Sequence, residues 1–239
     1  MFVNKLLIFF CKLQQPYIDT KLWPVIVTLK AYSRGGKLML LLEGNDLWVN
    51  LKTSFVDIDE LLLFLKYQHF SGYLQLEFSD SQGAVFIQQG DVVNGVVALE
   101  EERNTGSKAV RSILARSRQD KNGTIKVTQL PVQNIRFLSE AYGLSVRLLH
   151  KNLSSKYSPL GDFIIKLQYE GFSGCLEIWF PVDDKRGIIF LENGRTKAIM
   201  TEELLVDLKE DTPAQVKFTD SFINRAQRAG VQYNTFVET

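Results

Sequence analysis

Two segments of the chain carry the same pattern of apolar positions at an offset of 102 residues. In each, large apolar residues recur at i, i+3, i+4 and i+7, which places them along one face of a helix. Asp57 with Glu60 three positions later predicts the start of the first helix, and Ser158-Pro159 predicts the start of the second. The apolar positions are Ile58, Leu61, Leu62 and Leu65 in the first segment and Leu160, Phe163, Ile164 and Leu167 in the second.

Each predicted helix leads through Phe-Ser-Gly into a stretch in which every second residue is large and apolar. Alternation of this kind predicts a strand with one face on a core and the other face toward solvent. A second strand follows in each segment and ends at Gln89-Gly90 or at Asn193-Gly194, of which the latter is a strong hairpin signal. A third strand is predicted at 92–97 and at 196–200. The inward positions are Leu74, Leu76 and Phe78, then Leu176, Ile178 and Phe180; the opposite face carries Tyr73, Gln75 and Glu77, then Cys175, Glu177 and Trp179.

The similarity between the two segments extends to residue identity. Aligning 57–78 with 159–180 and, after a two-residue insertion, 83–90 with 187–194 gives ten identities in thirty positions. A period near 100 residues is too long for a solenoid repeat and indicates a duplicated unit. We therefore expect two homologous copies within the chain.

The remaining elements complete the predicted copies. The first copy continues with a helix at 107–117 and a strand containing Ile125 and Val127. The second continues with a short helix containing Leu204, Leu205 and Leu208 and a strand around Val216 and Phe218. Between the copies we expect a helix at 131–142 and a polar linker at 152–157. The predicted fold class is α+β: two homologous units, each a small antiparallel sheet packed against one or two helices.

The stretch 86–93, Phe-Ile-Gln-Gln-Gly-Asp-Val-Val, together with the preceding Phe-Ser-Gly, resembles the PATAN-like domains, a bacterial family found beside response regulators. The order of a leucine-rich helix, Ser-Gly, a strand, a glycine-terminated hairpin, a helix and a final strand is also similar. The family usually has a small residue after the hairpin, and Gly95 and Ala198 lie near that position. The resemblance implies a non-catalytic module that contacts proteins, among them receiver domains of response regulators.

The resulting domain organisation has five parts. The first PATAN-like domain covers 39–130, a connecting helix and linker cover 131–154, the second PATAN-like domain covers 155–220, and 221–239 form a C-terminal tail. Residues 1–38 differ in charge, with six basic residues and one acidic residue. Because Arg34-Gly35-Gly36-Lys37 can be encoded by a purine-rich run resembling a ribosome-binding site, we expect translation to start at Met39. The apolar run at 6–11 is far shorter than the roughly 20 residues that span a bilayer.

A basic run extends from Arg103 to Lys126, with Asp120 as the opposing charge. On a helix, Lys108, Arg111 and Arg118 would share one face, which suits either a nucleic-acid interface or a solvated helix surface. Residues 39–239 hold 22 basic and 26 acidic residues, a net charge of −4. This balance disfavours a general binder of polyanions, because affinity for phosphates depends on the number of neutralising cations.

Catalytic chemistry has little support in the composition. Two cysteines and two histidines exclude a disulfide framework and a cysteine-rich zinc site. We expect His69 in a loop, His150 without a catalytic partner and Asp183-Asp184 at a polar hairpin tip. The sequence therefore predicts no catalytic residue, no metal ligands and no cofactor.

The sequence favours a cytoplasmic bacterial protein that acts by protein–protein contact in two-component or motility-type regulation. The alternative function is a nucleic-acid-associated regulator that uses the basic run. The candidate interaction residues are Trp179, placed on the predicted polar face of its strand, the hairpin glycines Gly90 and Gly194, and Lys108 and Arg111 of the basic run.

Overall fold

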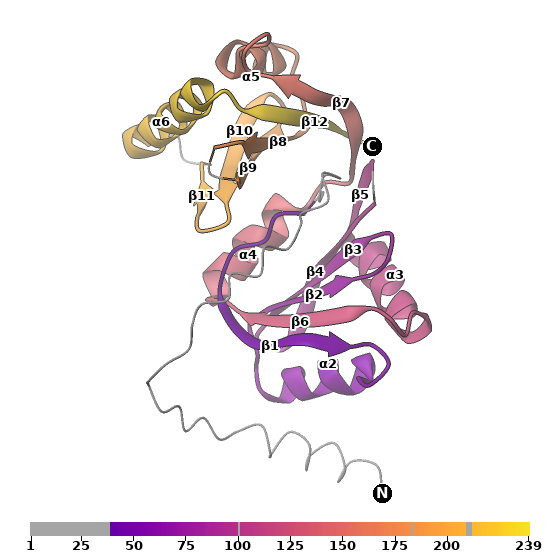
Figure 1. Cartoon of the computed structure of the whole chain (residues 1–239). Helices are drawn as coiled ribbons and strands as arrows, with labels where there is room; N and C mark the ends of the chain where they lie inside the picture. Colours follow the sequence, from indigo (N-terminus) through magenta and orange to yellow (C-terminus); the bar gives the residue numbers. More distant parts are fainter. Residues whose placement is uncertain (1–38, 100, 183, 209–211) are drawn as a thin grey trace, which may run out of the picture. The chain divides into compact units, whose positions relative to one another are not determined.

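A computed structural model describes residues 39–239 except 100, 183 and 209–211 (Figure 1). The described strands form one antiparallel sheet of twelve strands in the order β1-β6-β2-β3-β4-β5-β7-β12-β8-β9-β10-β11. The strands are β1 (Asn45–Lys52), β2 (Gly72–Glu77), β3 (Gln82–Gln88), β4 (Asp91–Ala98), β5 (Glu102–Thr105), β6 (Thr124–Gln129), β7 (Val146–Ser154), β8 (Gly174–Phe180), β9 (Lys185–Glu192), β10 (Arg195–Thr201), β11 (Leu205–Asp207) and β12 (Gln232–Glu238). The helices are α2 (Ile58–Tyr67), α3 (Gly106–Gln119), α4 (Val132–Ala141), α5 (Leu160–Tyr169) and α6 (Pro213–Ala229).

The prediction of two separate small sheets is wrong, because β5 pairs with β7 and joins both sets of strands. Glu102 lies opposite Arg147 and Arg103 opposite Val146 in this antiparallel pair, and the Leu148 N–H donates to the Glu101 carbonyl at 2.8 Å. The broad α+β description holds for this larger sheet. No local pattern in the sequence specifies this pairing, since β5 has four residues and overlaps the start of the basic run.

The strand order is the same on both sides of the β5–β7 junction. We call Asn45–Gln129 the first half and Val146–Glu238 the second half; β1-β6-β2-β3-β4-β5 in the first corresponds to β7-β12-β8-β9-β10-β11 in the second. Left-handed backbone recurs at matched positions: Asn50 and Asn152 both have φ of 58°, and Gln89 and Asn193 both have φ of 51°. The two halves therefore repeat one backbone plan, and descent from a duplicated unit stays a prediction.

The Phe-Ser-Gly glycine is required by a close approach of two strands. A Cβ on Gly72 would lie 2.1 Å from the carbonyl oxygen of Thr128 on β6, and a Cβ on Gly174 would lie 2.0 Å from that of Phe236 on β12. Both distances are far below van der Waals contact. The motif thus fixes where β2 and β8 enter the sheet, at the end of the preceding helix.

Two helices cover one face of the sheet in each half. In the first half α2 begins at Asp57, whose carboxylate accepts the N–H groups of Asp59 and Glu60, and buries Ile58, Leu61 and Leu65. These side chains pack with Leu74, Val85, Ile113 and others into one core cluster. An equivalent cluster in the second half forms under α5 and α6.

The opposite face of the sheet is also buried, contrary to the prediction of a solvated polar face. Tyr73 and Phe86 from the first half and Cys175 and Phe190 from the second belong to one shared cluster with Tyr142. Helix α4 contributes to this shared layer and lies between strands of the two halves (Figure 1). The predicted helix at 131–142 is confirmed by α4, which connects the two halves along the chain and also packs in the layer that they share.

The end of the second half differs most from the sequence prediction. Val216 and Phe218 lie in α6, not in a strand, and Leu205 lies in β11, not in a helix. Residues 221–239, expected as a tail, form the second part of α6 and β12, which lies between β7 and β8. The predicted linker at 152–157 begins inside β7. The expectation for residues 1–38 lies outside the described residues.

Candidate interaction surfaces

Large apolar side chains are exposed at matched positions in the two halves. Four pairs at an offset of 102 belong to the exposed large apolar side chains: Leu47 and Leu149, Phe55 and Tyr157, Leu63 and Ile165, and Tyr67 and Tyr169. The aromatic members are the most accessible, at 84% and 82% for Phe55 and Tyr157 and at 74% and 89% for Tyr67 and Tyr169. Single exposed apolar residues are ordinary, but recurrence at equivalent positions of the two halves is a separate observation.

Two of these pairs lie on matched helices. Leu63 and Tyr67 are one turn apart on α2, so their side chains are neighbours on its outer surface, opposite the buried stripe. Ile165 and Tyr169 occupy the same places on α5. The apolar stripe does not predict these positions, because they fall outside it. The identity of Tyr67 and Tyr169 in the alignment of the two segments is the feature of the sequence that indicates them.

The hairpin glycines Gly90 and Gly194 lie beside the ends of these helices. The Gly90 N–H donates to the Phe70 carbonyl at 2.8 Å, and a Cβ on Gly90 would lie 2.7 Å from the Lys66 carbonyl oxygen. In the second half the Gly194 N–H donates to the Phe172 carbonyl at 2.9 Å. These contacts explain the glycines structurally and place both hairpin tips next to the exposed tyrosines.

Trp179 lies on β8 with 37% of its surface exposed. Its indole N–H donates to the Asp184 carboxylate at 3.1 Å, which ties the ring to the hairpin between β8 and β9. Gln232 of β12 is its neighbour in the sheet. The structure thus gives Trp179 a local structural role and leaves part of the residue accessible, so its role in partner binding stays a prediction.

Three cations of the basic run are paired with acidic residues distant in sequence. Arg116 pairs with Asp80, Arg118 pairs with Asp59 and Lys126 pairs with Asp46. The Arg118 contact lowers the pKa of the Asp59 carboxyl group, because the guanidinium donates hydrogen bonds to its ionised form. Lys108 and Arg111 lie exposed on α3 without an ion pair among the described residues. The face that the run presents is therefore much less basic than the sequence suggests.

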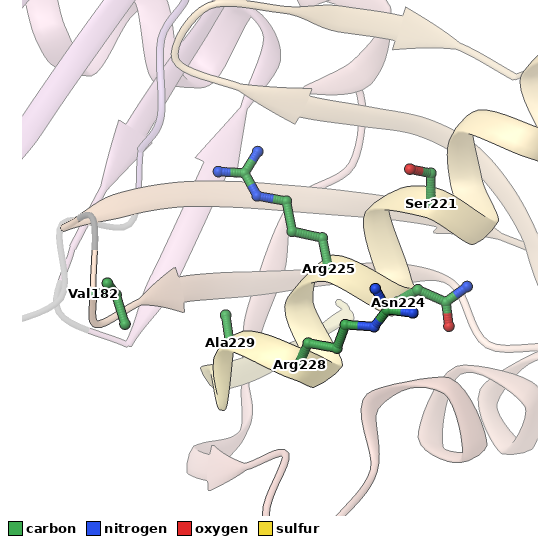
Figure 2. Close-up of a pocket in the computed structure, with 6 residues that line it drawn as sticks. All are labelled: Val182, Ser221, Asn224, Arg225, Arg228 and Ala229. Carbon is green, nitrogen blue, oxygen red and sulfur yellow. The ribbon is translucent and has the colours of Figure 1, made fainter.

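A surface depression of about 610 Å³ lies along α6 (Figure 2). Val182, Ser221, Asn224, Arg225, Arg228 and Ala229 line it. Figure 2 shows that the Arg225 and Arg228 side chains extend in different directions. The Arg225 guanidinium lies 5.5 Å from the centre of the Phe180 ring, as Arg116 lies 4.9 Å from that of Phe78 in the first half. This arrangement does not aim the two cations at one ligand position.

A buried polar cluster joins the halves in the shared layer. Arg103 is 2% exposed, and one of its terminal nitrogens donates to the Cys175 sulfur at 3.2 Å. Its guanidinium stacks 4.8 Å from the centre of the Tyr142 ring. Burial raises the pKa of the Cys175 thiol, which disfavours the reactive thiolate. Although part of the Glu177 surface stays accessible, burial of its carboxyl group raises its pKa to about 7, against the opposing pull of the Arg103 and Arg186 charges.

The remaining candidates for chemistry are scattered. Within the described ranges, no three His, Cys, Asp or Glu side chains are grouped so that they could hold a metal ion. His69 occupies the turn between α2 and β2 with a left-handed φ of 49°, and His150 lies exposed on β7. None of the described helices is both long and apolar enough to cross a bilayer.

Comparison with known proteins gives no relative. Protein-family models, curated proteins and solved structures were searched, and none matches the chain.

Proposed function

We propose that this protein is a bacterial signalling or regulatory protein that binds other polypeptides through the outer surfaces of α2 and α5 and performs no catalysis. The observation that carries the proposal is the recurrence of exposed Leu63 and Tyr67 at the positions of Ile165 and Tyr169. The helix cores and glycine turns are retained for folding, but folding gives no reason to keep these outward apolar side chains in both halves.

The energetics favour a role in binding. Removing one large apolar side chain from water contributes about 1.5–3 kcal/mol, so a leucine–tyrosine pair can anchor a partner helix or loop. Tyrosine suits such a position, since its ring is apolar and its hydroxyl can hydrogen-bond to the partner. Two matched surfaces on one sheet would let the protein hold two similar partners or two sites of one partner.

Receiver domains of response regulators are the partner class that the PATAN-like resemblance implies, and we propose them as the first to test. The nucleic-acid alternative is less well supported. Three of its basic side chains, Arg116, Arg118 and Lys126, are ion-paired, and Arg103 is buried.

Affinity capture with matched variants tests the proposal. The full chain is immobilised beside an α2 variant, Leu63→Ser with Tyr67→Ser, and an α5 variant, Ile165→Ser with Tyr169→Ser. A third bait, Lys108→Ser with Arg111→Ser on α3, controls for the number of surface changes and removes the exposed cations of the basic run. Proteins captured from a lysate of the source cells are quantified by mass spectrometry.

We expect a set of proteins, including receiver-domain proteins, that the wild type and the α3 variant retain and that both helix-face variants lose. Purified receiver domains from this set should then bind the wild type directly. An identical protein profile from all four baits would refute the proposal. Loss of co-purified nucleic acid from the α3 variant alone would favour the alternative.

A further inference from the structure

The space between β7 and α5 is open, whereas the same space in the first half is filled. Trp48 on β1 and Phe64 on α2 pack against each other there, with ring centres 6.0 Å apart. The residues at their positions in the second half, at the offset of 102, are His150 and Lys166. An imidazole and a flexible amine thus replace an indole and a phenyl ring on an equivalent backbone.

The result is a pocket of about 400 Å³. Its floor is apolar: the Phe163 ring lies 6.2 Å edge-on from the His150 ring and 5.5 Å from the Tyr233 ring. The pocket is lined by His150, Leu153, Ser158, Pro159, Asp162, Phe163 and Lys166.

We propose that this pocket binds a planar aromatic ring that carries a carboxylate. The first half supplies the argument for the ring, because its own Trp48 indole occupies the matching space against an aromatic neighbour. The acidic group is the counter-charge proposed for Lys166, with His150 as a further hydrogen-bond donor. Such a ligand is either a free aromatic acid or an aromatic residue beside an acidic residue in a polypeptide.

Lys166 is the cationic side chain of the pocket lining and is the group that would pair with a ligand carboxylate. Lys166 provides a flexible ammonium group, which contacts Glu170 at 3.8 Å with both side chains exposed, so a ligand carboxylate can compete for it. His150 can donate an imidazole N–H in either protonation state. Asp162 is the acidic residue of the lining, and Ser158 already accepts a hydrogen bond from the Tyr233 hydroxyl at 2.9 Å.

The presence of two histidines in the chain allows a direct test by NMR. The imidazole signals of the full protein are followed while indole-3-acetate is added in one arm and the dipeptide acetyl-Asp-Trp-amide in another. The His150 signal should shift in at least one arm and the His69 signal should stay in place, since His69 lies in the α2–β2 turn. A shift with indole-3-acetate alone identifies a free acid as the source, and a shift with the dipeptide alone identifies a polypeptide.

Two comparison ligands separate the ring from the charge. Acetate lacks the ring and should leave both histidine signals unchanged. Indole-3-acetamide lacks the charge and should bind about two- to fivefold more weakly than indole-3-acetate, the effect of one exposed ion pair. The Lys166→Met variant should remove this difference between acid and amide.

The double variant His150→Trp with Lys166→Phe places the side chains of the first half in the second and should fill the pocket. Binding, followed here by the amide signals of α5, should fall at least tenfold while the rest of the amide spectrum remains that of the folded protein. The proposal is wrong if neither probe shifts His150 more than His69 at millimolar concentration, or if acetate produces the same shift. Because the wild-type titration decides this alone, a variant that fails to fold does not remove the test.

Discussion

The surfaces beside β1–α2 and β7–α5 have equivalent backbones but different side chains. In the first half Trp48 and Phe64 close the surface, and in the second His150 and Lys166 leave it open. At the outer helix positions the two halves are alike, because Leu63 and Tyr67 correspond to the exposed Ile165 and Tyr169. The comparison separates what both halves share, a pair of apolar helix faces, from what distinguishes them, a pocket in the second half.

The glycines before β2 and β8 should give the largest effect of substitution, and an equal one in both halves. Gly72→Ala and Gly174→Ala each force a Cβ against a backbone carbonyl, so each should lower the free energy of unfolding by about 3 kcal/mol or more. Gly106→Ala is the control, since φ there is +81° but no atom lies within 4 Å; it should cost about 1 kcal/mol. Urea unfolding measures all three. If Gly72→Ala lowers the free energy of unfolding no more than the control does, the close approach of β6 to Gly72 is not what requires glycine at this position.

The shared layer should be next in sensitivity. The Tyr142 hydroxyl donates to the Leu40 carbonyl and accepts the Leu40 N–H at 3.1 Å, all within a buried site. Tyr142→Phe leaves both backbone groups without a partner, so the free energy of unfolding should fall by about 1–3 kcal/mol. Amide exchange at Leu40 should accelerate with it. Tyr73→Phe removes the bond to the Leu42 carbonyl and a contact with the Thr128 hydroxyl, but it leaves no backbone N–H without a partner, so it should cost less; equal losses would contradict this explanation.

A smaller effect concerns pH and again separates the halves, because Glu177 corresponds to Gln75 at the offset of 102. The folded-state pKa of Glu177, about 7, exceeds its ordinary value of 4.5, so between these values the folded chain binds more protons than the unfolded chain. The free energy of unfolding should therefore fall as pH rises from about 4.5 to 7.

Glu177→Gln should remove that part of the slope and be more stable than the wild type at pH 8, by on the order of 1 kcal/mol. Urea unfolding at several pH values measures it, with Glu170→Gln at the exposed residue that follows α5 as the control. An unchanged slope in Glu177→Gln would show that the carboxyl group is not buried as described.

The smallest effect is expected at the turn before Phe-Ser-Gly. His69 has a left-handed φ of 49°, and Gly171 holds the matching position at 64°. His69→Gly should stabilise the protein by less than about 1 kcal/mol, since relief of strain is partly offset by the greater freedom of glycine in the unfolded chain. Gly171→Ala should destabilise by a similar amount. Thermal unfolding shows whether each variant is more or less stable than the wild type, and a destabilising His69→Gly would argue against strain at this turn.

The local pattern sufficed where one face of an element is buried and regular. It predicted α2, α5 and the three strands that follow each of them. The helix stripe that includes Leu61 keeps the helical period throughout, and the strand that includes Leu74 keeps the two-residue alternation. It failed at β1, where register shifts around Trp48 and a left-handed Asn50 break the alternation. It also failed at α6, where the pattern around Val216 and Phe218 predicts a strand although Phe222 and Ala226 continue a helical stripe.

Long-range features required the folded chain. The pairing of β5 with β7 and the burial of Tyr73 and Cys175 under α4 depend on partners that no short window contains. The same holds for the basic run, whose acidic partners Asp46 and Asp59 lie far away in sequence. The candidate surfaces are predictable from the sequence, because aligning the two similar segments shows matched apolar residues outside the helical stripe.

The most direct measurement is photo-crosslinking in living source cells. A benzophenone amino acid replaces Tyr67, Tyr169 or, as a reference, Lys121 in the exposed turn after α3. The account predicts covalent adducts with a common set of proteins from both tyrosine positions and little adduct from the reference. Equal or absent adducts at all three positions would contradict the claim that these two helix surfaces hold partners.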